Sequence, residues 1–226
     1  MAVLPMFPLG TVLLPSGVLP LHVFEPRYRR LAEDCLGGVP EFGVVLIERG
    51  SEVGGGDQRT QIGTVARIVE AATFDDGRYA LGTVGVRRIR VVRWLEDDPY
   101  PRAEVEDWDD PEPPPDLDER VAEATAHLRR VLATAAELGA DVAPASFELG
   151  DDPVLATYQL VALSPLGPHD RQALLAAPSA QERLGALVSL LEEELAFLHQ
   201  RLQLDADDGG LLDGPDDPDQ PGDPGR

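Results

Sequence analysis

The spacing of the hydrophobic residues changes at an acidic, proline-rich stretch near the middle of the chain. Residues 109–116 read Asp-Asp-Pro-Glu-Pro-Pro-Pro-Asp. Prolines at this density hold a segment extended and keep it out of helices and sheet interiors. Before the stretch the apolar residues form short runs rich in β-branched side chains, and after it they recur at helical spacing. The sequence therefore predicts a β-rich unit, a stiff linker over 109–116 and a helical unit.

Residues 1–108 are expected to form a small β-barrel. Apolar runs predict strands at residues 44–47, 62–69, 78–81, 84–95 and 103–105. Turn residues separate them, a glycine-rich stretch at 50–56 and Asp-Asp-Gly at 75–77. One helix interrupts the strands from Pro26 to Leu36, and Gly37 follows it as helices often end. Several short strands at this spacing favour a closed or nearly closed barrel.

Residues 117–204 are expected to form a helical bundle. The first helix carries one apolar stripe, made of Leu117, Val121, Ala124, Leu128, Val131/Leu132, Ala135 and Leu138. Pro153, after two aspartates, predicts the start of a second helix. Ser179 and Glu182 form a capping box that opens a long helix to about Leu204. Its stripe comprises Leu184, Leu187/Val188, Leu191, Leu195, Leu198 and Leu202. Residues 205–226, rich in Asp, Gly and Pro, are expected to be a disordered acidic tail.

The net charge of −22 lies mostly in the second half of the chain. Residues 1–100 carry 11 arginines against 13 acidic residues, whereas residues 101–200 carry 6 against 20. A field of this sign repels nucleic-acid phosphates and anionic membranes. No apolar run approaches the roughly 18 residues of a membrane span, and the proline-broken N-terminus lacks the basic region of a signal peptide. We therefore expect a cytoplasmic protein with no membrane partner, for which nucleic acid is disfavoured.

Residue types needed for several kinds of catalysis are missing. The chain contains no lysine, which excludes a Walker A lysine, a Ser-Lys dyad and a Schiff base. Cys35 is the single cysteine, and the four histidines lack metal-binding spacing. No serine stands in a Gly-x-Ser-x-Gly setting. We therefore expect no catalytic residue, no cofactor and no metal site.

Several segments carry a resemblance to a known family. They are Phe7-Pro8-Leu9-Gly10, Val12-Leu13-Leu14-Pro15, Leu19-Pro20-Leu21-His22-Val23-Phe24-Glu25-Pro26-Arg27-Tyr28-Arg29, Asp76-Gly77-Arg78-Tyr79 and Asp152-Pro153-Val154-Leu155-Ala156. Together they resemble the N-terminal, substrate-binding domain of Lon proteases. The resemblance covers about residues 4–200.

The resemblance implies an α+β fold, with a PUA-like β-barrel followed by a C-terminal helical bundle. It also implies a role in binding proteins or peptides, because this region of Lon helps to engage substrates. The chain is identified as a stand-alone member of this family, so we expect neither the ATPase nor the protease module of Lon. A peptidase label would then come from the family name alone.

The segment around the predicted first helix is one candidate peptide-binding site. His22, Phe24, Arg27 and Tyr28 combine aromatic and basic side chains that could line a groove for an extended or hydrophobic peptide. The alternative is that Phe24 and Tyr28, four residues apart, belong to the core, with Glu25 and Arg27 in a structural role.

The end of the long helix is a second candidate. Leu195, Leu198 and Leu202 continue its stripe toward a tail with little apolar cover, and we expect them to bind polypeptide at the seam between the two halves. The alternatives are that the bundle buries the stripe or that a second copy of the chain covers it as a homodimer.

Arginines 87, 88, 90 and 93 stud one predicted strand. Alternation sends Arg88 and Arg90 to one face and Arg87 and Arg93 to the other, so they form no single stripe. Ion pairs with the abundant acids are the first interpretation, and an RNA-binding patch is the alternative. Arg88 matches a family position and is expected to form a structural ion pair.

The leading hypothesis is a non-catalytic module that binds unfolded or extended polypeptide or a protein client, as an adaptor, a holder or a regulator of proteolysis. The alternatives are an RNA-binding PUA-like protein and a small-ligand-binding protein. An exposed apolar groove favours the first, a continuous arginine face the second, and a buried polar constellation the third.

Overall fold

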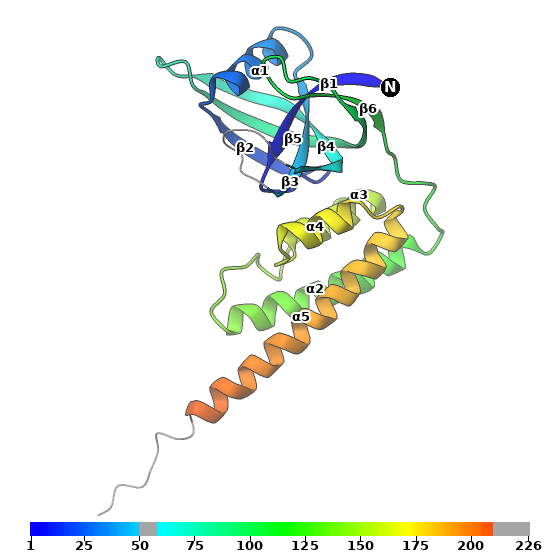
Figure 1. The fold of residues 1–226 in the computed structure, drawn as a ribbon. Helices are drawn as coiled ribbons and strands as arrows, with labels where there is room; N and C mark the ends of the chain where they lie inside the picture. The colour runs from blue at the N-terminus through cyan, green and yellow to red at the C-terminus, as the bar shows by residue number, and fades with distance from the viewer. Residues whose placement is uncertain (50–57, 210–226) are drawn as a thin grey trace, which may run out of the picture.

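The computed structural model describes residues 1–49 and 58–209, which form a barrel and a helical bundle joined by one linker (Figure 1). The strands are β1 (Ala2–Leu9), β2 (Val18–Val23), β3 (Glu41–Arg49), β4 (Gln58–Thr73), β5 (Tyr79–Trp94) and β6 (Arg102–Asp107). The helices are α1 (Pro26–Leu36), α2 (Leu117–Glu137), α3 (Pro153–Leu163), α4 (Pro168–Leu175) and α5 (Ala180–Gly209). The predicted fold class, an α+β barrel followed by a helical bundle, is confirmed.

Five strands close into a ring. β1 pairs in parallel with β3 and antiparallel with β6, and β6 also pairs with β5. The β3–β4 and β4–β5 pairings complete the circle. β5 can serve two neighbours because it is long: Tyr79–Val84 pairs with β2, and Ile89–Trp94 pairs with β6. Register shifts along β4 and β5 bend both strands, as bulges do at barrel corners.

Some boundaries differ from those expected. Strands β1 and β2 were not predicted, because each contains proline, which lacks a backbone N–H. The two strands expected at 78–81 and 84–95 are one strand, β5. Helix α4 was not predicted, and α5 continues to Gly209, past the expected end at 204. The glycine-rich turn at 50–56 and the expected tail beyond residue 209 lie outside the described residues.

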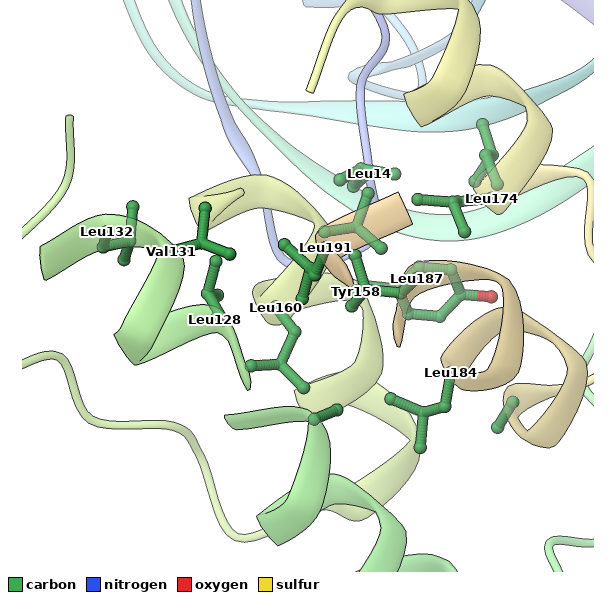
Figure 2. Close-up of a cluster of buried hydrophobic side chains, with 14 of the residues drawn as sticks. Leu14, Leu128, Val131, Leu132, Tyr158, Leu160, Leu174, Leu184, Leu187 and Leu191 are labelled. Atoms are coloured by element: carbon green, nitrogen blue, oxygen red, sulfur yellow. The ribbon is translucent and has the colours of Figure 1, made fainter. Parts of the chain in front are cut away.

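The bundle is built on α2 and α5, which pack against each other along their apolar stripes (Figure 1). Figure 2 shows this core, with Leu128, Val131 and Leu132 of α2 facing side chains of α3 and α5. Leu14, from the segment between β1 and β2, lies in the same cluster. The barrel therefore contributes directly to the core of the bundle, which fixes one half against the other.

The barrel has its own core, beneath α1. Leu31, Ala32 and Cys35 of α1 are buried with Phe42 of β3. Burial raises the pKa of the Cys35 thiol to about 12, so the thiol stays protonated at neutral pH and is a poor nucleophile. Across the part of the chain that the structure describes, no helix is both long and apolar enough to cross a bilayer.

Candidate functional site

A corner between β2 and α1 places one aromatic side chain outward. β2 ends at the buried Val23, and α1 begins at Pro26, whose fixed φ suits the first helical position. Glu25 between them has extended backbone angles, and its carbonyl accepts the first helical hydrogen bond, from Arg29. Phe24 therefore lies outside the helix, and 57% of its surface is exposed.

Two small apolar hollows flank Phe24. The inner hollow, about 210 Å³, is lined by Phe7, Leu9, Pro20, Leu21, His22, Val23, Phe24, Glu25 and Tyr28. The hairpin hollow, about 130 Å³, is lined by His22, Val23, Phe24, Phe74, Arg78 and Tyr79. Because they share three residues, they lie side by side, and we call them the Phe24 hollows. Phe74, on the β4–β5 hairpin, is 44% exposed, so aromatic surface meets solvent from two elements.

The other predicted residues of this segment have different surroundings. Tyr28 is 4% exposed and stacks on Phe7, with ring centroids 4.0 Å apart, so it is both barrel core and floor of the inner hollow. Arg27 lies over the Tyr28 ring, with Cζ 4.5 Å from its centroid, and donates to Glu25. His22 and Phe24 are exposed at the edge. The segment thus lines a hollow and also makes structural contacts, and its role in binding peptides stays a prediction.

The predicted α5 residues do not join this site. Leu198 is 5% exposed and lies in the bundle core, and Leu195 packs against the same core. Leu202 is half-buried one turn further on. Figure 1 shows this end of α5 pointing away from the barrel. The structure therefore corrects the prediction that these leucines reach the seam, because the helix carries them outward from it and the stripe is largely core.

The seam itself holds a buried polar cluster. Arg88 of β5 is 3% exposed and donates to the carbonyls of Leu175 and Ala177, at 2.8 and 2.7 Å. Its Nη2 lies 3.2 Å from Asp110 of the linker. Arg183 of α5 donates to both oxygens of the same carboxylate. One acid from the linker thus joins the barrel strand to the last helix.

Tyr158 completes this seam cluster, which consists of Arg88, Asp110, Tyr158 and Arg183. Its hydroxyl donates to Asp110 at 2.7 Å and accepts from Arg183 at 2.7 Å. Burial raises the pKa of Tyr158 well above its usual range. Two guanidiniums share one carboxylate, and the polar side chains bond chiefly to one another and to backbone carbonyls. Such a constellation suits a structural joint better than acid–base chemistry.

A cleft of about 270 Å³ opens beside the seam cluster, with Trp108 and Tyr158 in its walls. Three acids, Asp109, Asp110 and Glu112, line it together with two arginines that already have partners. The lining thus mixes acids with arginines that are already paired, and it matches no single class of ligand.

The other arginines of β5 are also paired. Arg87 contacts Glu41 and Asp107, and the remaining pairs are Arg90 with Glu106 and Arg93 with Glu104. Arg88 and Arg90 both contact the Trp108 ring, so they share a face as alternation predicts. The strand presents neutralised pairs rather than a continuous cationic face.

Comparison with known proteins agrees with this architecture. The family model of the ATP-dependent protease La (Lon) substrate-binding domain matches residues 3–193. The chain belongs to the Lon substrate-binding domain family. Lon protease 1 of Herpetosiphon aurantiacus is 26% identical over 218 residues, which cover 92% of this chain but 26% of that protein. Lon protease of Dictyoglomus thermophilum is 39% identical over 105 residues, 46% of this chain and 13% of that protein. The chain thus spans about a quarter or less of these Lon relatives.

Solved structures of the Lon family share the fold over most of the chain. A Lon N-terminal domain protein from Xanthomonas campestris is 30% identical, with a TM-score of 0.60 and coverage of 84% of this chain and 98% of that one. The N-terminal domain of the Mycobacterium avium complex Lon protease covers the same shares with a TM-score of 0.62, and at 18% identity it supports the fold alone.

Several residues that build these sites were not predicted from the sequence. Phe74 and Tyr79 flank the predicted Asp-Asp-Gly turn, and a hairpin there brings them beside Phe24. The sequence could have pointed to Arg183, because it is a charged residue next to the apolar stripe of α5. No sequence feature distinguishes Asp110, since it is one of 41 acidic residues and lies in a segment expected only to be a spacer.

Proposed function

We propose that this chain is a non-catalytic module that binds apolar segments of unfolded or extended polypeptides at the Phe24 hollows. The observation that carries the proposal is the exposed Phe24 ring between two apolar hollows, beside the exposed Phe74. Large exposed aromatic side chains around a concavity are typical of protein interaction sites, where aromatic residues supply much of the binding energy.

The sizes of the hollows fit side chains rather than folded ligands. A cavity of about 150 Å³ can hold a benzene molecule, and the hollows measure about 130 and 210 Å³. Each can therefore accept one large apolar side chain. Two hollows side by side suit two such side chains of one extended segment, because a strand projects alternate side chains to the same face.

Family membership supports the same class of ligand, since the matched domain is the substrate-binding one. The paired arginines of β5 give RNA no free cationic face. The absence of lysine leaves the chain without the residue on which a Walker A loop or a Ser-Lys dyad depends. In this proposal the chain engages a client, as an adaptor, a holder or a regulator of proteolysis, and performs no hydrolysis.

Fluorescence anisotropy of a labelled short peptide tests the proposal. The peptide carries fluorescein and has Phe and Leu at alternate positions in a Gly/Ser background. Phe24→Ser should weaken binding at least about tenfold, the equivalent of roughly 1.4 kcal/mol, because it removes the ring shared by both hollows. Phe197→Ser is the matched control, since Phe197 on α5 is 55% exposed, nearly as much as Phe24.

If both substitutions weaken peptide binding equally, the binding is nonspecific hydrophobic association and the proposal is contradicted. Sedimentation of the free chain addresses the competing occupant, a second copy. A dimer that dissociates on Phe24→Ser would assign the hollows to self-association instead of client binding.

A further inference from the structure

Arg29 is an exception among the arginines of the barrel. Apart from it, every arginine side chain described in residues 1–108 has an acidic or carbonyl partner. Arg29 has neither a hydrogen-bond nor an ion-pair partner for its side chain among the described residues, and its Nε is buried without an acceptor. In a chain with 41 acids and 19 arginines, an unmatched guanidinium is unexpected.

The surroundings of Arg29 hold its guanidinium in one place. The residue is the fourth of α1, and its Nη2 packs against Gly77 at the tip of the β4–β5 hairpin. Gly77 has a φ of +80°, which favours glycine, and any side chain there would collide with Nη2. The hairpin tip therefore accommodates the guanidinium without offering it an acceptor.

The hairpin hollow lies on the same turn. Phe74 and Arg78 stand on either side of Gly77, and both line the hollow. The charge of Arg78 is matched by Asp76, with Nε 2.7 Å from Oδ2. Neither Asp76 nor Asp75 lies within ion-pair distance of Arg29 in the described structure. Arg29 is thus the unmatched positive charge beside an apolar hollow.

Building on the proposed function, we propose that Arg29 pairs with a carboxylate of the bound segment, so that the Phe24 hollows select apolar side chains next to an acidic group. A carboxylate can accept two parallel hydrogen bonds from a guanidinium, and such charge-assisted bonds are short and strong. Although the whole chain is acidic, residues 1–100 carry a net charge of only −2, so the barrel itself repels an anion little.

Three peptides that differ at one position test this selectivity. Each has the Phe/Leu pattern described above and an amidated C-terminus, with Glu, Gln or Lys beside the Phe. The wild-type chain should bind the Glu peptide about threefold to tenfold more tightly than the Gln peptide, with the Lys peptide weakest. Arg29→Gln should lower affinity for the Glu peptide until it equals that for the Gln peptide.

Two further variants separate charge pairing from folding. Arg30→Gln removes the next residue of the same helix, whose guanidinium already pairs with Asp34, and it should keep the preference for Glu. Arg29→Lys keeps the charge without the planar fork and should retain part of the preference. A Gln peptide with a free C-terminus shows whether a chain end can supply the carboxylate instead of a side chain.

A preference for Glu that survives in Arg29→Gln would overturn the inference, as would equal affinities or a preference for Lys in the wild-type chain. If the Gln peptide binds in a Phe24-dependent way without any preference for Glu, the inference fails and the proposed function stands. If no peptide binds, both fail.

Discussion

The barrel and the bundle use their large apolar side chains in opposite ways. The barrel leaves Phe24 and Phe74 exposed around two hollows, whereas the bundle buries the stripes of α2 and α5 against each other. Their charges differ too, since residues 1–100 are nearly neutral and residues 101–200 carry a net charge of −14. Under the proposed function, recognition belongs to the barrel, while the bundle supplies an acidic support.

The seam between them resembles neither half. The barrel surface has exposed ion pairs and the bundle core is apolar, but the seam cluster is buried and polar. Asp110 is the one carboxylate that both Arg88 and Arg183 contact. Coulombic attraction there is weakly screened, so this carboxylate strengthens a seam that Leu14 and the Arg88 hydrogen bonds to Leu175 and Ala177 also hold.

Asp110→Asn should therefore have the largest effect on stability of any substitution considered. Removing one partner of a buried ion pair leaves uncompensated charge, here on two guanidiniums, and costs about 3–5 kcal/mol. Urea denaturation at pH 7 should show this loss in the free energy of unfolding. Asp109→Asn, at the exposed neighbouring position, should change that free energy by less than about 0.5 kcal/mol. Similar losses in both variants would refute the assignment of Asp110 as the joint.

The same contrast explains what the sequence could predict about the fold. Helix α1 has the predicted bounds, because proline at its start and glycine after its end are local signals. Strands β1 and β2 were missed because their prolines suppress a local strand signal, although long-range pairing tolerates them. Asp110 contacts Arg183, 73 residues away, and nothing in the acidic linker distinguishes it from its neighbours.

The candidate site was predictable only in part for a similar reason. Phe24 and Tyr28 were compared as helical neighbours four residues apart, but α1 begins at Pro26, so only Tyr28 follows the helical spacing. The helix buries Tyr28, and the corner before it exposes Phe24. Phe74 reaches the same site through the sheet, a contact that no spacing within either segment specifies.

Leu198→Ser in the bundle should have the second-largest effect. It removes a buried apolar side chain and places a hydroxyl in the core, which together cost about 2–4 kcal/mol. Phe197→Ser, one residue earlier and 55% exposed, should change the free energy of unfolding by less than about 0.5 kcal/mol. Thermal melts and urea titrations measure both.

This pair of substitutions also decides between the earlier interpretations of the α5 stripe. Lower stability of Leu198→Ser at every protein concentration supports a core position. A loss that appears only together with dissociation of a dimer, seen by sedimentation, would instead place Leu198 at a seam between two copies.

Glu41→Gln on the barrel should have the smallest effect, and that effect should depend on pH. Glu41 contacts Arg67 and Arg87, each at 2.8 Å. Burial alone would raise the pKa of Glu41, but the hydrogen bonds from these arginines outweigh it and hold the pKa below its ordinary value. A carboxyl with a lower pKa in the folded state stabilises the fold above its ordinary pKa of about 4.3, and this contribution is lost as pH falls through the folded-state value.

At pH 7 we therefore expect Glu41→Gln to lower the free energy of unfolding by about 1 kcal/mol, less than Asp110→Asn because Arg67 and Arg87 are partly exposed and solvated. Below about pH 4 the free energies of unfolding of the wild-type chain and the variant should converge, because Glu41 is then increasingly protonated in both the folded and the unfolded chain. Urea denaturation at several pH values measures this difference in the free energy of unfolding, which we call the gap. Glu104→Gln, which removes a more exposed partner of Arg93, is the matched control and should produce a smaller gap at pH 7. A gap for Glu41→Gln that stays constant across this pH range would show that packing at the start of β3, and not charge, accounts for its effect.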